Sequence, residues 1–218
     1  MPNDPYNPLE KINLAQSISS ALLQSPVISM AEFESFNGAG VYAIYYTGDF
    51  PAYRPLKAAN AKGKLEWPIY VGKAIPTGSR KGGLTTDSSM GNALFSRITK
   101  HASSIQSAGN LEIKDFSARY LIVDDIWIPL GENMLIESFH PLWNSVIDGF
   151  GNNDPGSRRA KQYRSPWDVL HPGRSWAEKL ANNPVTVTEL EKRISDYFGN
   201  ESVPTEGNID DDTADSKE

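Results

Sequence analysis

The chain has 218 residues, of which 39% are apolar and 22% charged, as expected for one globular domain with a sizeable core. It contains no cysteine, which excludes disulfides, thiolate metal sites and thiol nucleophiles. No run of 18 apolar residues occurs, and residues 1–8 lack the basic and apolar regions of a secretory signal. We therefore expect a cytoplasmic protein.

The net charge of −6 belongs to the C-terminal end of the chain. Residues 199–218 hold seven acids and one base, whereas residues 1–198 hold twenty of each. The polar, acidic composition of residues 199–218 predicts a disordered tail. Residues 1–198 are then expected to form a single, electrically neutral domain, so the acidic total does not argue against a nucleic-acid partner.

Basic residues gather in two segments that are rich in Gly, Pro, Ser or Asn. This composition predicts loops rather than faces of a helix. Such loops either contact phosphates or are simply solvated, and the composition does not decide between the two. The segments contain Arg54, Lys57, Lys62, Lys64, Lys73, Arg80 and Lys81, and then Arg158, Arg159, Lys161 and Arg164.

The hydrophobic pattern predicts helices in five parts of the chain. An N-terminal helix is expected to end before Pro26, and a second helix is expected over residues 131–140, with Glu132 in its first turn and Pro141 ending it. Apolar residues at spacings of four, four and three predict an amphipathic helix between them, over residues 94–105. Segments 176–180 and 188–198 also read as helical, with Thr188 and Glu191 as a capping box.

Three short segments rich in β-branched and aromatic residues predict strands over residues 41–46, 69–71 and 116–123. With the helices, they predict an α+β fold, in which a small antiparallel or mixed sheet of about three strands is flanked by helices. Side chains alternate along a strand, so Tyr42 shares a face with Ile44, and Tyr70 shares one with Gly72. If the first two strands pair, both phenols can face one site. Gly72, beside the charged Lys73, suggests either a close approach of another group to the backbone or a strand end next to a polar site.

Two polar side chains border the apolar stripe of the helix over residues 94–105. Arg97 and His101 are four residues apart, so they lie on one face, and each precedes a stripe residue by one position. They are therefore expected to flank the core. Arg suits a phosphate, and His can carry a proton near neutral pH.

Glu132 and Glu137 compete for a role on the next helix, and the helical period favours Glu132. It precedes Leu135 and Ile136 by three and four residues, which places it on the apolar face. An inward acid requires a partner, either a cation of the protein or a metal ion. Mg²⁺ takes one or two protein carboxylates together with water and phosphate oxygens, so one Glu suffices.

These segments together resemble the GIY-YIG nuclease superfamily. Its two tripeptides match Gly40-Val41-Tyr42 and Tyr70-Val71-Gly72, and its Leu-x-x-Arg-x-x-x-His pattern matches residues 94–101. Its metal-binding Glu, followed twelve residues later by an Asn after a Pro, matches Glu132 and Asn144. The resemblance covers residues 38–146, and residues 147–198 would form a C-terminal helical extension.

The resemblance implies a role for each matched residue in DNA hydrolysis. Glu132 would hold Mg²⁺, for which Mn²⁺ can substitute, and Arg97 would stabilise the transition state. Tyr42 would take the proton of the attacking water or orient the water, assisted by Tyr70 and His101. Asn144 would orient the phosphate or the metal ligand, and Lys73 is a candidate base or phosphate contact.

Long insertions after Tyr42 and after Lys73 resemble the type II restriction branch of the superfamily, and among its members the enzymes that recognise CCGCGG. This branch implies a homodimer on palindromic, G·C-rich double-stranded DNA. Arg158, Arg159 and Arg164 would read guanines, and the lysines of the first basic segment would contact phosphates.

Three other functions fit parts of the sequence. Glu112-Ile113-Lys114 imitates the Glu-x-Lys of another nuclease fold, with Asp87 as its partner acid. A GIY-YIG repair or homing nuclease would normally carry further domains. A non-catalytic DNA-binding module is the third alternative.

Overall fold

A computed structural model of the chain describes residues 10–75, 91–156 and 161–200. At its centre is a four-stranded antiparallel sheet with the strand order β1-β4-β2-β3. The strands are β1 Ile28–Ser29, β2 Gly40–Tyr46, β3 Pro68–Ala74 and β4 Phe116–Ile122. The predicted α+β class is confirmed, as are the three predicted strands. The two-residue β1 is too short to be recognised from a sequence pattern.

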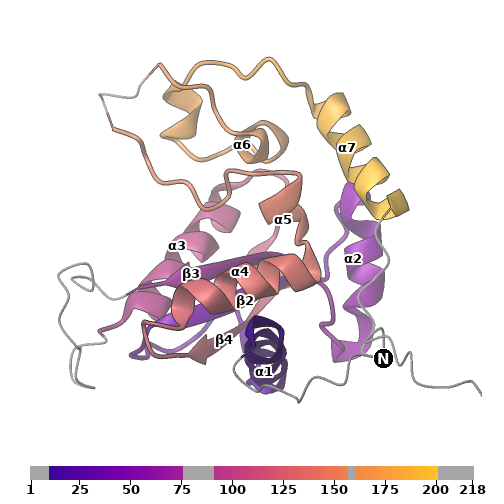
Figure 1. The fold of residues 1–218 in the computed structure, drawn as a ribbon. Helices are drawn as coiled ribbons and strands as arrows, with labels where there is room; N and C mark the ends of the chain where they lie inside the picture. Colours follow the sequence, from indigo (N-terminus) through magenta and orange to yellow (C-terminus); the bar gives the residue numbers. More distant parts are fainter. Residues whose placement is uncertain (1–9, 76–90, 157–160, 201–218) are drawn as a thin grey trace, which may run out of the picture.

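Helices cover both faces of the sheet (Figure 1). On one face, α1 packs against α4 and β4, and α4 packs against β2 and β3. On the other face, α3 and α5 contact β3, and the C-terminal segment with α6 and α7 follows. The helices are α1 Lys11–Gln24, α2 Arg54–Ala59, α3 Ala93–Ser107, α4 Ile128–Phe139, α5 Leu142–Ser145, α6 Pro166–Leu170 and α7 Val187–Asn200.

The central strand β2 is buried on both sides, and its alternating side chains enter two separate cores. Val41, Ala43 and Tyr45 join a core with α1 and α4, whereas Tyr42, Ile44 and Tyr46 join the core beneath α3 and α5. The predicted stripe of α3 is buried in this second core at Leu94, Ile98, Ala102 and Ile105. The alternation along one strand therefore separates Tyr42 from the face that carries α4.

Gly40, which begins β2, has a conformation and surroundings that exclude a side chain. Its φ of +155° is one that residues with a side chain rarely adopt. A Cβ atom at this position would lie 2.0 Å from the carbonyl oxygen of Leu121 on the neighbouring strand β4. The first glycine of the motif is thus required by strand pairing rather than by chemistry.

Three helix predictions were wrong in their bounds. Helix α4 begins at Ile128, so Glu132 lies beyond the first turn rather than within it. The capping box of α7 is formed by Thr186 and Glu189, two residues earlier than predicted: each side chain accepts a hydrogen bond from the other's backbone N–H. Between residues 176 and 180 only a single 3₁₀ turn, Ala177–Lys179, forms.

The first basic segment is not entirely loop, because Arg54 and Lys57 lie on α2. Pro55 within its first turn and the buried Leu56 explain this short helix. Arg80, Lys81, Arg158 and Arg159 lie outside the described residues, as do Asp87 and residues 201–218 of the predicted acidic tail. Residues 199 and 200 of that tail belong to α7. Within the described ranges, no helix is long and apolar enough to cross a membrane.

Candidate active site

A pocket of about 530 Å³ opens at the free edge of β3. Four of the predicted residues line it, namely Tyr70, Lys73, Arg97 and Glu132. They come from both faces of the sheet: Tyr70 points toward α3, whereas Lys73 points toward α4. Because β3 is an edge strand, side chains from its two faces meet around its open side. The fold thereby joins residues that alternation along the strand separates.

Glu132 lies inward on α4, as the helical period predicted, while Glu137 is exposed. Its carboxylate is 17% exposed and forms an ion pair with the ammonium of Lys73, which is 34% exposed. The ion pair supplies the partner that a partly buried acid requires. It also places a basic and an acidic group together at the edge of the pocket, next to Arg97.

Gly72 leaves the space that the phenol of Tyr42 occupies. The two residues are direct partners across β2 and β3, and a Cβ atom at Gly72 would lie 2.4 Å from Tyr42 Oη. Tyr70 lies diagonally beside Tyr42 on the same face, with the ring centroids 6.2 Å apart. The predicted meeting of the two phenols and the predicted close approach at Gly72 are therefore both observed.

Tyr42 and His101 form a buried pair behind the pocket. Tyr42 Oη lies 2.6 Å from His101 Nε2, and the exposed fraction of the side chain is 0% for Tyr42 and 2% for His101. His101 is thus inside the core rather than at its flank, whereas the half-buried Arg97 lies at the flank as predicted. Arg97 Nη2 donates a hydrogen bond to the carbonyl oxygen of Gly151, at 3.1 Å.

Burial determines the protonation of these groups. It raises the pKa of Tyr42 well above its usual value, an effect that Tyr70 adds to and Arg97 opposes. It also raises the pKa of Tyr70, again opposed by Arg97. The pKa of His101 is lowered well below its usual value by burial and then by the charges of Arg97 and Arg174. At neutral pH the site therefore holds two neutral phenols and a neutral imidazole.

A second buried histidine, His171, is held by two hydrogen bonds. Its Nδ1 lies 2.9 Å from the amide oxygen of Asn110, which can only accept, so Nδ1 is the protonated nitrogen. Nε2 then accepts a hydrogen bond from the hydroxyl of Tyr53, at 2.6 Å. Burial lowers the pKa of His171 to about 3.

These two histidines predict a loss of stability on acidification. A histidine whose pKa is lowered in the folded state contributes stability above its unfolded pKa of about 6.5, because below that value the unfolded chain binds the extra proton. When the pH falls from 7 to 5, we expect His171 alone to lower the free energy of unfolding by about 2 kcal/mol, and His101 to lower it further. Urea unfolding of the wild type and of His171→Gln at both pH values measures the contribution. Equal pH dependence in the two proteins would contradict the assignment.

Asn144 on α5 is bound to the backbone of the edge strand. Its amide oxygen accepts from the N–H of Val71 and its amide nitrogen donates to the carbonyl oxygen of Val71, each at 2.8 Å. The amide thus replaces the strand that β3 lacks on this side and holds the segment between Tyr70 and Lys73. Its contact with a phosphate or a metal ligand stays a prediction.

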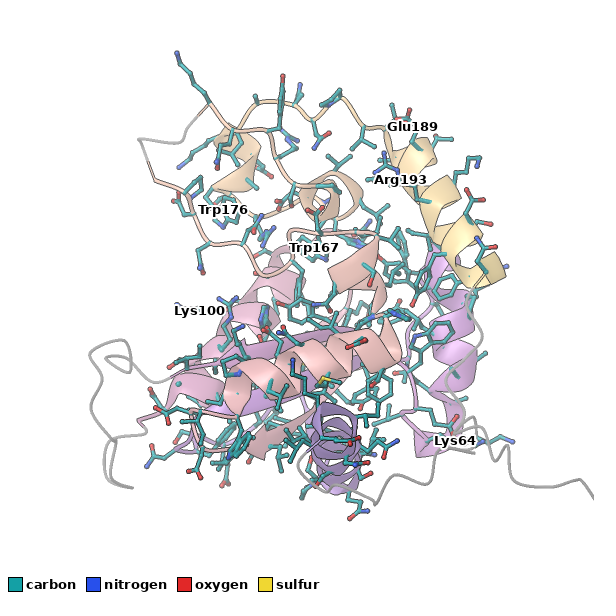
Figure 2. All side chains as sticks on the ribbon, in the orientation of Figure 1. Lys64, Lys100, Trp167, Trp176, Glu189 and Arg193 are labelled. Atoms are coloured by element: carbon teal, nitrogen blue, oxygen red, sulfur yellow. The ribbon has the colours of Figure 1, made fainter. Side chains whose placement is uncertain are left out.

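The described members of the first basic segment lie away from the pocket, except for Lys73. Lys57 is ion-paired with Asp49, and Lys64 with Glu66. Figure 2 places Lys64 and the pocket residue Lys100 on opposite sides of the molecule. Lys62 lies with Lys57 in a separate hollow beside the end of α2. The role of these lysines and of Arg54 in binding DNA stays a prediction.

Two features of the site escaped the sequence analysis. Lys100 lines both this pocket and a neighbouring one of about 350 Å³, and its position three residues after Arg97 on α3 was the available signal. The other is Arg174, which is buried against Asp168 and lines the neighbouring pocket. Nothing in the local sequence distinguishes Arg174 from an exposed arginine.

A family model described as the Eco29kI GIY-YIG domain matches residues 34–198. The chain belongs to this family. The match extends over residues 147–198 as well as over residues 38–146. No curated protein matches the chain.

Membership of the Eco29kI GIY-YIG family supports the restriction branch and a nuclease acting on DNA. The rival Glu-x-Lys site has no support in the structure: Glu112 and Lys114 are exposed and ion-paired with each other at the turn before β4. Three of the pocket residues, Tyr70, Arg97 and Glu132, instead belong to the positions that carry the GIY-YIG resemblance.

Proposed function

We propose that this protein is a Mg²⁺-dependent type II restriction endonuclease that cuts double-stranded DNA at a short palindromic, G·C-rich site, with CCGCGG as the candidate sequence. The observation that supports it most is the convergence of Tyr70, Arg97 and Glu132 on one open pocket in a member of the Eco29kI GIY-YIG family. A restriction enzyme acts on DNA that has entered a prokaryotic cell, so its proposed location is the cytoplasm.

Arg97 is suited to bind the scissile phosphate. It is always charged, and its hydrogen bond to Gly151 uses one nitrogen of the guanidinium and fixes its orientation. The remaining donors can face the pocket that Arg97 lines. In this position the guanidinium stabilises the negative charge that develops on the phosphoryl oxygens during hydrolysis.

The tyrosines and His101 are proposed to act on the attacking water. Tyr70 lines the pocket, and Tyr42 lies behind it in contact with His101. The lowered pKa of His101 makes its neutral imidazole a weak proton acceptor, so its proposed role is to hold the hydroxyl of Tyr42, which orients the water or takes its proton with the charge of Arg97 nearby. Tyr42 has no exposed surface in the free protein, whereas Tyr70 lines the pocket. DNA binding must therefore open a path beside Tyr70 by which the water reaches Tyr42.

Glu132 is the residue we propose to hold the metal ion. Among the described residues that line the pocket it is the one acid, and no group of three or more His, Asp or Glu side chains suited to a metal ion occurs in the described ranges. One carboxylate with water and phosphate oxygens is a donor set that fits Mg²⁺, although Lys73 must share or release the carboxylate. When bound, Mg²⁺ would supply a Lewis acid for the phosphate and the leaving oxygen.

Recognition of the site is proposed to involve the second basic segment. Its described members, Lys161 and Arg164, precede α6, and the N–H of Arg164 donates a backbone hydrogen bond to the carbonyl oxygen of Ala181. Arg158 and Arg159 complete the proposed set of guanine contacts. A palindromic site and one catalytic pocket per chain favour a homodimer on DNA, in which each subunit cuts one strand.

Cleavage of a plasmid with and without CCGCGG, in Mg²⁺, Mn²⁺, Ca²⁺ or EDTA, tests the proposal. We expect discrete fragments with Mg²⁺ and with Mn²⁺, only from the plasmid that carries the site. A smear would indicate a nonspecific, repair-type or homing-type nuclease, and uncut DNA that is still bound would indicate a DNA-binding module. Discrete fragments from another sequence would leave the enzyme class standing and overturn CCGCGG.

A further inference from the structure

The guanidinium of Arg174 is buried, and the groups around it fix its orientation. It is 3% exposed, and its Nε donates to Asp168 Oδ1 at 2.7 Å. Cζ of its planar guanidinium lies over the rings of Trp167 and Trp176, 4.5 and 4.6 Å from their centroids. Figure 2 shows these two tryptophans in the C-terminal segment above the sheet. Asp168 is itself fixed, because Oδ2 accepts from the hydroxyl of Ser165 at 2.6 Å.

The remaining donors of Arg174 bind the backbone that leads from α5 to α6. Nη2 donates to the carbonyl oxygen of Gly149 at 3.0 Å, and Nη1 donates to that of Phe150 at 3.1 Å. A longer contact of 3.4 Å joins Nη1 to the carbonyl oxygen of Asn152. One side chain therefore holds three carbonyl groups of a segment that has no regular secondary structure.

The same segment contacts the side chains of the active site. Gly151, between two of the held carbonyls, accepts the hydrogen bond from Arg97. The ring of Phe150 is stacked on that of His101, with the centroids 4.4 Å apart and the planes 21° apart. A Cβ atom at Gly151 would lie 2.8 Å from Tyr70 Oη, so the segment is packed directly against the pocket.

Two simpler roles for Arg174 fit the structure less well. A phosphate contact would need free donors on an accessible guanidinium, whereas this one is buried and bonded to four acceptors. A purely stabilising role is weak, because a buried ion pair is often no more stable than apolar packing of the same volume. What the pair adds is a fixed geometry for the carbonyls that it holds.

We propose that Arg174, oriented by Asp168, is a positioning residue of the active site. It holds the segment of residues 149–152, and through Gly151 and Phe150 it sets the direction of Arg97 and keeps His101 against Tyr42. The inference rests on the proposed nuclease function. It makes the C-terminal extension a part of the catalytic apparatus, although the extension lies outside the motifs that define the superfamily.

The kinetic test replaces Arg174 by Lys, which keeps the charge and loses the planar fork. In single-turnover cleavage we expect the rate to fall by about 10- to 100-fold, while the affinity for DNA changes by less than about threefold. In a protein that already carries Arg97→Lys, the same replacement should lower the single-turnover rate by less than about threefold, because its effect on the rate passes mainly through Arg97. Leu56→Ala, a buried change on the distant α2, controls for general destabilisation.

A second measurement does not depend on cleavage. In protein labelled with ¹⁵N-arginine, the side-chain signal of Arg97 should broaden and exchange with water about tenfold faster in Arg174→Lys. Arg119, which donates to the carbonyl oxygen of Ser25, provides an unaffected reference signal in the same spectrum. If Arg174→Lys does not fold, Asp168→Asn replaces it in both tests.

The outcomes separate the two proposals. An unchanged Arg97 signal, or a rate loss that is equal in both backgrounds or matched by Leu56→Ala, overturns the positioning role. A wild-type protein that cuts no DNA overturns the nuclease function, and the Arg97 signal then still decides whether Arg174 holds the site.

Discussion

Replacing Glu132 by Ala is expected to abolish metal-dependent cleavage, with a fall in the single-turnover rate of about 10³-fold or more. The reason is that Glu132 is the one carboxylate on the described wall of the pocket, so the proposed metal ion loses its protein ligand. Binding of specific DNA in Ca²⁺ should be unchanged or slightly tighter, because a negative charge near the phosphates is removed. Gel shift and quenched-flow cleavage measure the two quantities.

Glu137→Ala is the matched control for this variant. It removes the same side chain from the same helix, five residues further on, where it is exposed. We expect normal cleavage from Glu137→Ala. Normal cleavage by Glu132→Ala would show that the metal is held elsewhere, and a parallel loss of DNA binding would show that Glu132 acts in folding or in docking.

Gly72→Ala is expected to disrupt the active site by displacing the buried ring of Tyr42. The added methyl group would lie 2.4 and 2.6 Å from Oη and Cζ of Tyr42, whose ring is enclosed by the core and bonded to His101. Because that ring cannot move aside freely, we expect a loss of about 1–3 kcal/mol in the free energy of unfolding. Displacement of Tyr42 from His101 should lower the cleavage rate per folded molecule by about 10²-fold.

Gly109→Ala serves as the control for Gly72→Ala, since the nearest atom to its added Cβ is the carbonyl oxygen of Pro172 at 3.8 Å. We expect near-normal stability and cleavage from it. Urea unfolding and single-turnover cleavage apply to both variants. If Gly72→Ala is destabilised but cleaves normally per folded molecule, the exact place of Tyr42 is unimportant for the reaction.

Local patterns in the sequence predicted the elements that carry the site. Alternation along β2 and β3 placed Tyr42 and Tyr70 on one face, and the stripe of α3 placed Arg97 at the flank of the core. The period of α4 selected Glu132 over Glu137. These predictions succeeded because each depends on contacts between residues close in the chain or on a simple repeat.

Other aspects of the site depended on distant parts of the chain and could not be predicted. His101 is buried in part by the ring of Phe150, which lies 49 positions later in the chain. The helical period of α3 gives no information about so distant a residue. The hydrogen bonds of the Asn144 amide to Val71 form because β3 is an edge strand, and its contact with a phosphate or a metal ligand stays a prediction. The position of Lys57 and Lys62 in a hollow beside α2, away from the pocket, likewise follows from the path of an insertion.

The α+β class, the central strands and the inward carboxylate follow from local patterns in the sequence, since backbone geometry repeats every two or 3.6 residues and the apolar pattern reports it directly. The meeting of Tyr70, Lys73, Arg97 and Glu132 around the open side of one edge strand is visible in the folded protein alone. The same holds for the hydrogen bonds by which Arg174 holds the segment behind them. Strand order and the docking of the C-terminal extension are set by the packing of two separate cores, which no local pattern encodes.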